Sequence, residues 1–435
     1  MTRERRYRIL IGGYALSSYG TYLNMVALNL YVYAVTERAV AVGAFMAVRL
    51  AAGFVAGLVV GPVLARWSAR GVMFWVNVVQ AAVLVVLVTV PDGLRTATLF
   101  VVSAVGGVTG TVFVVALRGS VIPEMVAEER RTWANSLMVS WRSLAMVAGF
   151  ASAGVVVSLL GYTAAFLVDM VTFLVCAVAV AQLPVSSAEP EASGETVEED
   201  GAGREDRRRV PRALVALAAA PVLGLMVLLR AVDALGSSSH NAALPVYSTE
   251  LDTDSPAVFV SVFWCVWAVG NVLVQQVIQR WTSRSGRAVG ALGFGFGTIA
   301  MSAGFILAFA GLPWAATVLV GLVAGAADGL TEVSYTSHLQ TLPDALRTHA
   351  FGLSATVESL GFGVGMVAVG AALEAYSPLV VVAVAHGVAI AIAVVFVAMV
   401  LRERAGAKAE KGAESPRSLL PFAQSGGHPR AQEGD

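Results

Sequence analysis

The stretch GPVLARWSARGVMFWVNVVQAAVLVVLVTVP, residues 61–91, joins a short basic loop to an apolar run of membrane-crossing length. A helix that spans a bilayer needs about 20 mostly apolar residues, and the residues after Arg70 supply them. The run Val83–Val90 does not alternate between apolar and polar residues, as a strand of a membrane barrel would. The stretch therefore predicts a transmembrane helix, in which every backbone amide is satisfied within the helix itself.

The whole chain has the composition of a polytopic membrane protein. Of its 435 residues, 57% are hydrophobic and only 13% are charged, and the mean hydropathy is +0.75. Soluble proteins carry about 25% charged residues, so this chain has too few of them to cover a soluble surface. We expect an all-α fold of twelve transmembrane helices, near residues 8–35, 39–64, 71–91, 96–122, 133–158, 162–183, 212–247, 256–279, 288–312, 314–337, 348–373 and 378–401.

Two polar stretches divide the chain into four regions. Residues 184–212 run from an acidic segment into a cluster of arginines, and residues 403–435 are polar with scattered Gly, Pro and Ser. Neither stretch has enough apolar residues to bury a core, so both are expected to be disordered. The predicted organisation is a six-helix bundle at 1–183, the linker, a second six-helix bundle at 213–402, and the tail.

An internal repeat relates the two bundles. Residues 66–70, Arg-Trp-Ser-Ala-Arg, match residues 280–284, Arg-Trp-Thr-Ser-Arg, at an offset of 214. Further matches follow in the same order: Pro123-Glu124 with Pro343-Asp344, and Gly149 and Gly154 with Gly365 and Gly370. Because these matches keep their order at a nearly constant offset, they indicate a duplicated six-helix unit, as in many transporters.

The basic residues are distributed unevenly about the predicted helices. Of the 29 Lys and Arg residues, 23 fall in the N-terminus, the linker, the tail and the loops on their side, whereas only Arg38 and Arg95 fall on the other side. Since cytoplasmic loops carry the excess of basic residues, both termini and the linker are predicted to be cytoplasmic. The formal net charge is zero, so we expect no nucleic acid partner.

Together these features resemble the major facilitator superfamily along all twelve predicted helices. The signature loop of that family is present in Gly61, Arg66 and Arg70, although Ala65 stands where the family has Asp. Within the family the chain is most similar to the macrolide-efflux and siderophore-exporter branch. The stretches that carry this similarity are residues 17–20, 123–136 and 166–173.

The resemblance implies a plasma-membrane transporter that works by alternating access, with helices one, four, seven and ten around a central cavity. It further implies proton-driven antiport that exports a small amphipathic drug-like or natural-product molecule, as in multidrug efflux. The chain departs from that branch at Thr21, where relatives carry Asp, and at Phe150, where exporters often carry Pro. An importer or facilitator with the same fold, and a ligand sensor that transports nothing, therefore stay open as alternatives. We expect a monomer.

Charged residues inside the predicted spans are candidates for proton coupling, because each costs about 2.5–3.5 kcal/mol at the bilayer centre. Asp328 and Glu332 lie four residues apart and so share a helix face. Two like charges on one face favour the binding of a proton by one of them, as a proton-coupled carrier requires. The coupling candidates are Asp328, Glu332, Asp233 and Glu358. For Asp233 the alternative is a fixed ion pair with Arg230, three residues before it.

Polar and aromatic residues of the predicted spans are candidates for substrate binding: Tyr22, Asn24, Asn29, Arg230 and Arg142. Rings and amides suit a large amphipathic ligand, although an interfacial aromatic belt is the alternative for helix one.

The internal repeat aligns Arg142 with Glu358. The two could be halves of a switch, or each could pair within its own bundle, Arg142 with Asp169 and Glu358 with a polar group of the tenth helix. His240, His338 and His386 have no ligand-like spacing and are interpreted as isolated polar residues.

The basic loops after the second and eighth helices are expected to brace the cytoplasmic gate, through Gly61, Arg66, Arg70, Arg280 and Arg284. The sequence contains no nucleotide-binding loop, no His-Glu-x-x-His zinc motif and no Gly-x-Ser-x-Gly nucleophile elbow. Cys176 and Cys265 lie in apolar runs with no His or Cys nearby. We therefore expect no enzyme activity, metal or cofactor, and we expect a small-molecule substrate, protons and the lipid bilayer as partners.

Overall fold

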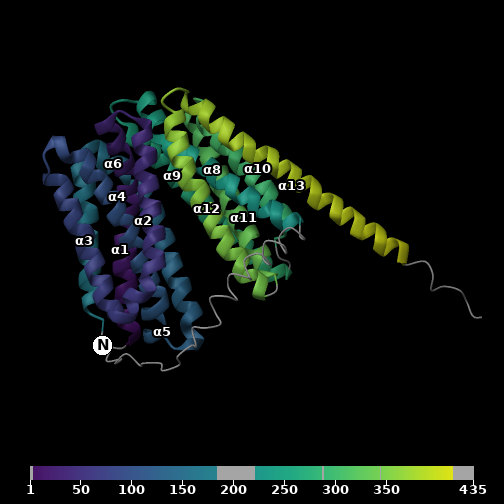
Figure 1. The fold of residues 1–435 in the computed structure, drawn as a ribbon, viewed down its shortest axis with the longest axis horizontal. Coiled ribbons are helices and arrows are strands. Elements are labelled where there is room, and N and C mark those ends of the chain that lie inside the picture. Colours follow the sequence, from purple (N-terminus) through teal and green to yellow (C-terminus); the bar gives the residue numbers. More distant parts are fainter. Residues whose placement is uncertain (1–2, 184–220, 287–288, 343, 415–435) are drawn as a thin grey trace, which may run out of the picture.

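The computed structural model describes residues 3–183, 221–286, 289–342 and 344–414, and within these ranges all regular secondary structure is helical. Figure 1 shows two groups of long helices side by side. The first group contains α1 (Arg3–Thr36), α2 (Ala39–Arg66), α3 (Ala69–Thr89), α4 (Asp92–Ala116), the short α5 (Ile122–Met125) and α6 (Arg131–Ala181). The second contains α8 (Pro221–Leu251), α9 (Pro256–Ser285), α10 (Ala291–Ala308), α11 (Trp314–Gln340), α12 (Asp344–Ala372) and α13 (Pro378–Glu414).

The helices have the lengths that a membrane requires. Among the described residues, 10 segments are long and apolar enough to cross a bilayer. One of them includes α6, whose 51 residues are interrupted at Gly161, with φ 80° and ψ 172°. This left-handed φ favours glycine, and it lies between the two spans predicted at 133–158 and 162–183. An all-helical membrane fold is thus confirmed, while the count of twelve spans stays a prediction.

The predicted linker and tail are reached only in part by the structure. Residues 184–212 lie outside the described residues, and so do residues 415–435. We expected the tail to begin at residue 403, but α13 continues to Glu414. The sequence between these points, Glu-Arg-Ala-Gly-Ala-Lys-Ala-Glu-Lys-Gly-Ala-Glu, is rich in Ala, Lys and Glu, which have high helix propensity in water.

The internal repeat reappears in the helix packing. A Cβ added to Gly149 of α6 would meet Tyr19 and Tyr22 of α1, and one added to Gly365 of α12 would meet Leu235 and Ser238 of α8. Each residue of the second contact lies 216 positions after its counterpart in the first. The same pair of helices therefore packs around an equivalent glycine in both halves.

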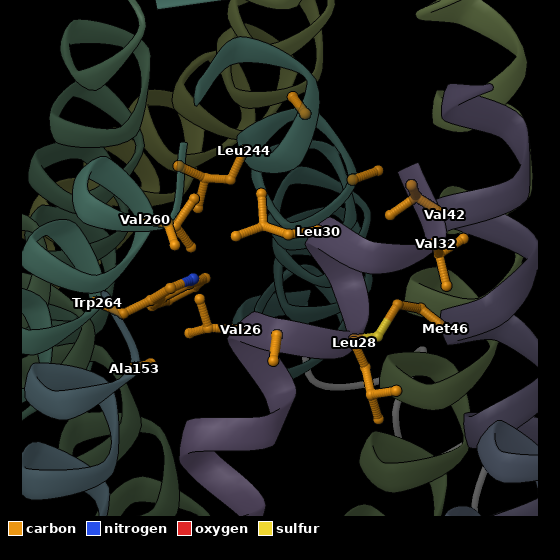
Figure 2. Close-up of a cluster of buried hydrophobic side chains, with 14 of the residues drawn as sticks. Val26, Leu28, Leu30, Val32, Val42, Met46, Ala153, Leu244, Val260 and Trp264 are labelled. Carbon is orange, nitrogen blue, oxygen red and sulfur yellow. The ribbon is translucent and has the colours of Figure 1, made fainter. Parts of the chain in front are cut away.

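The two halves share one hydrophobic core near one face and keep separate cores near the other. We call the face where α1 begins the N-terminal face, and the face with the turns at 37–38 and 373–377 the distal face. The shared core lies toward the distal face, and Figure 2 shows Val26 and Leu30 of α1 pointing toward Trp264 and Val260 of α9. Toward the N-terminal face, one core lies within the first half and another within the second. The structure is thus closed on its distal side.

Small residues allow α2 and α12 to meet backbone to backbone at this closed side. A Cβ on Gly43 would fall on the carbonyl oxygen of Met366, and a Cβ on Gly370 would lie 2.9 Å from the Cα of Val40. The backbone N–H of Val40 also donates to Glu374 Oε1 at 3.1 Å. Helices in membranes associate through such close contacts between small residues, so the distal closure depends on these glycines.

A first prediction concerns Gly43→Leu. The new side chain cannot be accommodated against a carbonyl oxygen, and overpacking of this kind costs about 1–3 kcal/mol. We expect the distal side to open, so that Leu30→Cys, in a chain lacking Cys176 and Cys265, reacts about tenfold faster with an impermeant maleimide. Gly57→Leu is the matched control on the same helix, because a Cβ there lies 3.9 Å from its nearest neighbour. Equal labelling of both variants would contradict the prediction.

Candidate functional site

A central cavity of about 370 Å³ lies between the two halves. In the first half it is lined by α1 and α6, and in the second half by α8, α9, α10, α11 and α12. The expected lining by the first, seventh and tenth helices is therefore present, whereas the described lining residues do not include α4, the expected fourth helix. Helices α6, α9, α10 and α12 contribute lining residues in addition.

Aromatic rings form the wall of the cavity that bridges the two halves. Phe150 of α6 stacks on Trp264 of α9, with ring centroids 5.8 Å apart, and Tyr22 of α1 meets Phe150 edge-on at 5.3 Å. Trp267 lies perpendicular to Trp264 at 5.2 Å. Phe150 is the residue at which the sequence departs from the Gly-Pro pair of exporters, and here it supplies a ring to the cavity.

Arg230 of α8 is the centre of the charged part of the cavity. Its guanidinium lies 2.6 Å from Glu332 Oε2 on α11, 3.1 Å from Glu358 Oε1 on α12 and 3.6 Å from Asp233 Oδ2. The Arg230 side chain is only 11% exposed, while those of Glu332 and Glu358 are 51% and 44% exposed. We call these four residues the Arg230 cluster. The ion pair expected from the spacing of Arg230 and Asp233 is present, but it is the longest of the three contacts.

Asp328 and Glu332 share a face of α11 but have different partners. Asn271 of α9 donates from Nδ2 to Asp328 Oδ2 at 2.8 Å, and Gln275 in turn donates to Asn271 Oδ1 at 2.7 Å. Glu332 instead contacts Arg230. Asp328 lines the central cavity, so it is a carboxyl group hydrogen-bonded by a neutral amide beside the Arg230 cluster.

The charges of the first half are arranged differently from what we expected. Arg142 lines the cavity and lies over the ring of Tyr22 at 6.0 Å, a cation–π contact. It does not pair with Asp169, which accepts hydrogen bonds from Asn24 Nδ2 at 2.7 Å and from Thr172 Oγ1 at 3.4 Å. Asp169 is therefore hydrogen-bonded within a second pocket, separate from the cavity that Arg142 lines.

Two of the predicted substrate-binding residues lie away from the central cavity. Asn24 lines the separate pocket of about 20 Å³, together with Arg49 and Asp169. Asn29 is buried, and its Oδ1 has no hydrogen-bond partner among the described residues. The other three, Tyr22, Arg142 and Arg230, do line the cavity.

The predicted gating residues lie near the N-terminal face, at the ends of α2 and α9 and the start of α3. Arg70 Nη2 donates to the carbonyl of Ala181, at the end of α6, at 2.7 Å. Gly61 and Arg66 are exposed on α2, and Arg280 and Arg284 are exposed on α9. Their role in a gate stays a prediction.

A histidine pair is the part of the site that sequence reasoning missed. His240 Nδ1 lies 3.1 Å from His386 Nε2, and His386 Nδ1 lies 3.1 Å from Ser302 Oγ. The first two residues are 146 positions apart, so their spacing carries no local signal. The internal repeat does give a signal, because its offset of 216 aligns His240 with Asn24 and brings His386 within one residue of the counterpart of Asp169.

The comparisons with known proteins agree with this geometry. The family model described as Major Facilitator Superfamily matches residues 10–342 and, in a second alignment, residues 226–430. The chain belongs to the major facilitator superfamily. It is therefore a multi-span membrane transporter, and the fold implies a small-molecule substrate. A comparison with curated protein sequences gives no match.

Solved structures with a similar fold include transporters described by different substrates. The nucleoside transporter NupG is similar with a TM-score of 0.66 at 15% identity, over 92% of this chain and 99% of that one. A bacterial homologue of the iron transporter ferroportin, in an inward-facing state, gives 0.67 at 14% identity, over 91% and 100%. A bacterial homologue of the human lysosomal transporter Spinster, inward-facing and unoccupied, gives 0.60 at 12% identity, over 91% and 95%. At these identities the likeness shows the fold alone.

Proposed function

We propose that this superfamily member is a proton-coupled secondary transporter that exports a small amphipathic molecule across the plasma membrane by alternating access. The observation that carries the proposal is the Arg230 cluster, where one buried guanidinium that lines the central cavity contacts carboxyl groups of three helices. Ionisable groups within membrane spans are costly and mark ion and substrate pathways.

The coupling step follows from the way the charges are shared. Glu332 and Glu358 are about half exposed, so protons from the open side reach them. A proton on either carboxylate weakens its contact with Arg230 and leaves that cation to the other partners. Because the contacts join α8 to α11 and α12, a change of protonation biases how these helices pack. Asp328, beside the cluster, is the proposed carrier of the transported proton.

The conformation supports alternating access with a defined direction. The excess of basic residues in its loops supports a cytoplasmic N-terminal face, and with that orientation a structure closed on its distal side is inward-facing. Two of the similar structures are also inward-facing. Rocking of the two halves about the cavity then opens the distal side, and the glycine contacts between α2 and α12 are the ones that part.

The cavity supports an amphipathic substrate. Its volume of about 370 Å³ lies within the range of small-molecule sites. Aromatic rings face it from both halves, and three carboxyl groups, those of Asp233, Asp328 and Glu358, line it together with two arginines. An aromatic or aliphatic body with a polar or cationic end fits this lining.

The test is uptake of ethidium and a panel of amphipathic antibiotics by inside-out vesicles containing the transporter. We expect accumulation of at least one compound when the vesicle interior is acidified, and its loss when the pH gradient is collapsed. Vesicles without the transporter are the control. Movement that ignores the gradient would favour a facilitator, for which Thr21 in place of an acid is the supporting residue. Binding without counterflow would favour a sensor.

A further inference from the structure

We propose that His240 is a substrate-binding residue whose hydrogen-bonding polarity is set by His386 and Ser302 behind it, so that one cavity wall serves ligands with either a donor or an acceptor. The inference deepens the proposed function, because it rests on a small molecule occupying the central cavity. It concerns recognition and not proton coupling.

The geometry makes His240 the only described histidine of the central cavity lining, with a buried hydrogen-bonded chain leading away from it. His240 and His386 are 3% and 0% exposed, and Ser302 is fully buried. The His240 ring stacks on Phe305 with centroids 3.5 Å apart and planes at 3°, and Phe305 also lines the cavity. The chain therefore starts at the cavity and ends inside the second half, between α8, α13 and α10.

A direct contact between two imidazole nitrogens holds a single proton, because one nitrogen must donate it and the other must accept it. Two neutral arrangements satisfy the chain. In the first, His240 Nδ1 donates to His386, whose Nδ1 donates to Ser302 Oγ, and His240 Nε2 is left as an acceptor. In the second, the Ser302 hydroxyl donates to His386, His386 Nε2 donates to His240, and His240 Nε2–H is left as a donor. A hydroxyl at the end permits both arrangements because it can donate or accept.

The first half has a polar pair, Asn24 and Asp169, at the position equivalent to the histidine pair, and the two pairs differ in their hydrogen bonding. A Cβ added to Gly20 would meet Asp169 and Thr172, and one added to Gly236 would lie 3.1 Å from His386 Nδ1, so the first and sixth helices of each half meet at an equivalent glycine. In the first half the polar pair is Asn24 and Asp169, which lines the small separate pocket. A carboxylate can only accept from the amide, so that pair has one fixed direction. The pair that faces the central cavity is the one that can reverse.

The ligand class follows from the surrounding groups. Phe305 and Trp264 lie 3.5 and 5.8 Å from the His240 ring, which favours a planar aromatic group next to it. The atom that meets His240 is then an uncharged substituent of that ring, either a hydroxyl or amine hydrogen, or an ether or carbonyl oxygen. A site with a fixed donor would reject one of these two kinds, since it would leave a buried polar group unpaired.

The test uses the full-length protein in lipid nanodiscs with its histidines labelled by nitrogen-15, since protonated and unprotonated ring nitrogens give separate signals. The probes are the phenol β-naphthol and its methyl ether, which differ in a single hydrogen-bond donor. We expect the ether to move the proton to His240 Nε2 and the phenol to leave that nitrogen unprotonated, with His386 following in each case. His240→Gln and His386→Gln assign the signals. His338 on α11, which does not line the cavity, is an internal control and should not change.

Affinity gives a second readout through quenching of tryptophan fluorescence. His240→Phe keeps an aromatic ring but cannot hydrogen-bond, so both probes should bind about fivefold more weakly. The control is Asn77→Leu, which replaces a buried polar residue of α3 that does not line the cavity. The proposal is overturned if neither probe binds the wild type, or if both bind while the histidine signals keep one arrangement. No proton gradient is present in these measurements, so they are independent of whether transport is proton coupled.

Discussion

Asp328→Asn is expected to lower gradient-driven uptake into inside-out vesicles by about two orders of magnitude, the scale of a lost proton-transfer group. Asparagine has nearly the same shape as aspartate, and its side-chain oxygen can still accept the hydrogen bond that Asn271 donates at 2.8 Å. The fold and the cavity should therefore be kept. What is lost is the ability of this position to bind and release a proton.

Counterflow separates this loss from general damage. A carrier that cannot exchange a proton can still exchange labelled for unlabelled substrate, so Asp328→Asn should retain counterflow while it loses accumulation. The matched variant is Glu332→Gln, on the same face of α11. It removes one of three carboxylates from Arg230, and we expect a smaller loss of about tenfold. Full gradient-driven uptake by Asp328→Asn would overturn its role as the proton carrier.

The fold could be predicted from the sequence because membrane helices are local structures. A run such as residues 71–91 determines its own helix in hydrocarbon, where backbone groups have no other partner. The break at Gly161 falls between the spans predicted at 133–158 and 162–183, and its positive φ is one that favours glycine. The repeat was visible in short loops, and the packing of Gly149 and Gly365 follows the same offset.

The site was less predictable because its contacts join distant parts of the chain. Spacing placed Asp233 next to Arg230, but the shorter contacts of Arg230 are with Glu332 and Glu358, up to 128 positions away. Sequence reasoning offered Asp169 as a partner of Arg142, whereas the closest acceptor contact of Asp169 is with Asn24. Pairing within a membrane protein depends on helix rotation, which hydrophobic runs do not fix.

The histidine pair shows that contacts between distant residues are hard to predict from one sequence, and that the internal repeat helps to find them. His240 and His386 were interpreted as isolated residues, and they are buried next to each other. Applying the repeat to polar residues, and not only to glycines and loops, aligns His240 with Asn24 and brings His386 within one residue of the counterpart of Asp169. An internal duplication therefore supplies some of the pairing information that a single sequence otherwise lacks.

Arg230→Gln is expected to destabilise the folded protein by about 3–5 kcal/mol, the cost of leaving a buried charge without its partner. Asp233 bears most of this cost, because its side chain is 5% exposed while Glu332 and Glu358 can be solvated. Transport should fall with stability, since the carboxylates then repel one another across α8, α11 and α12. The measurement is the free energy of unfolding in mixed micelles, together with vesicle uptake.

A double-mutant cycle identifies the origin of the loss. Adding Asp233→Asn to Arg230→Gln removes the buried unpaired charge, so the double variant should regain at least half of the lost stability. Uptake should not return, because the cation shared by the coupling carboxylates is still missing. Arg142→Gln is the matched control in the same cavity: its contact is with the ring of Tyr22, worth about 0.5–2 kcal/mol. If the double variant recovered transport along with stability, Arg230 would be a structural ion-pair partner, and the coupling mechanism would have to rest on Asp328 alone.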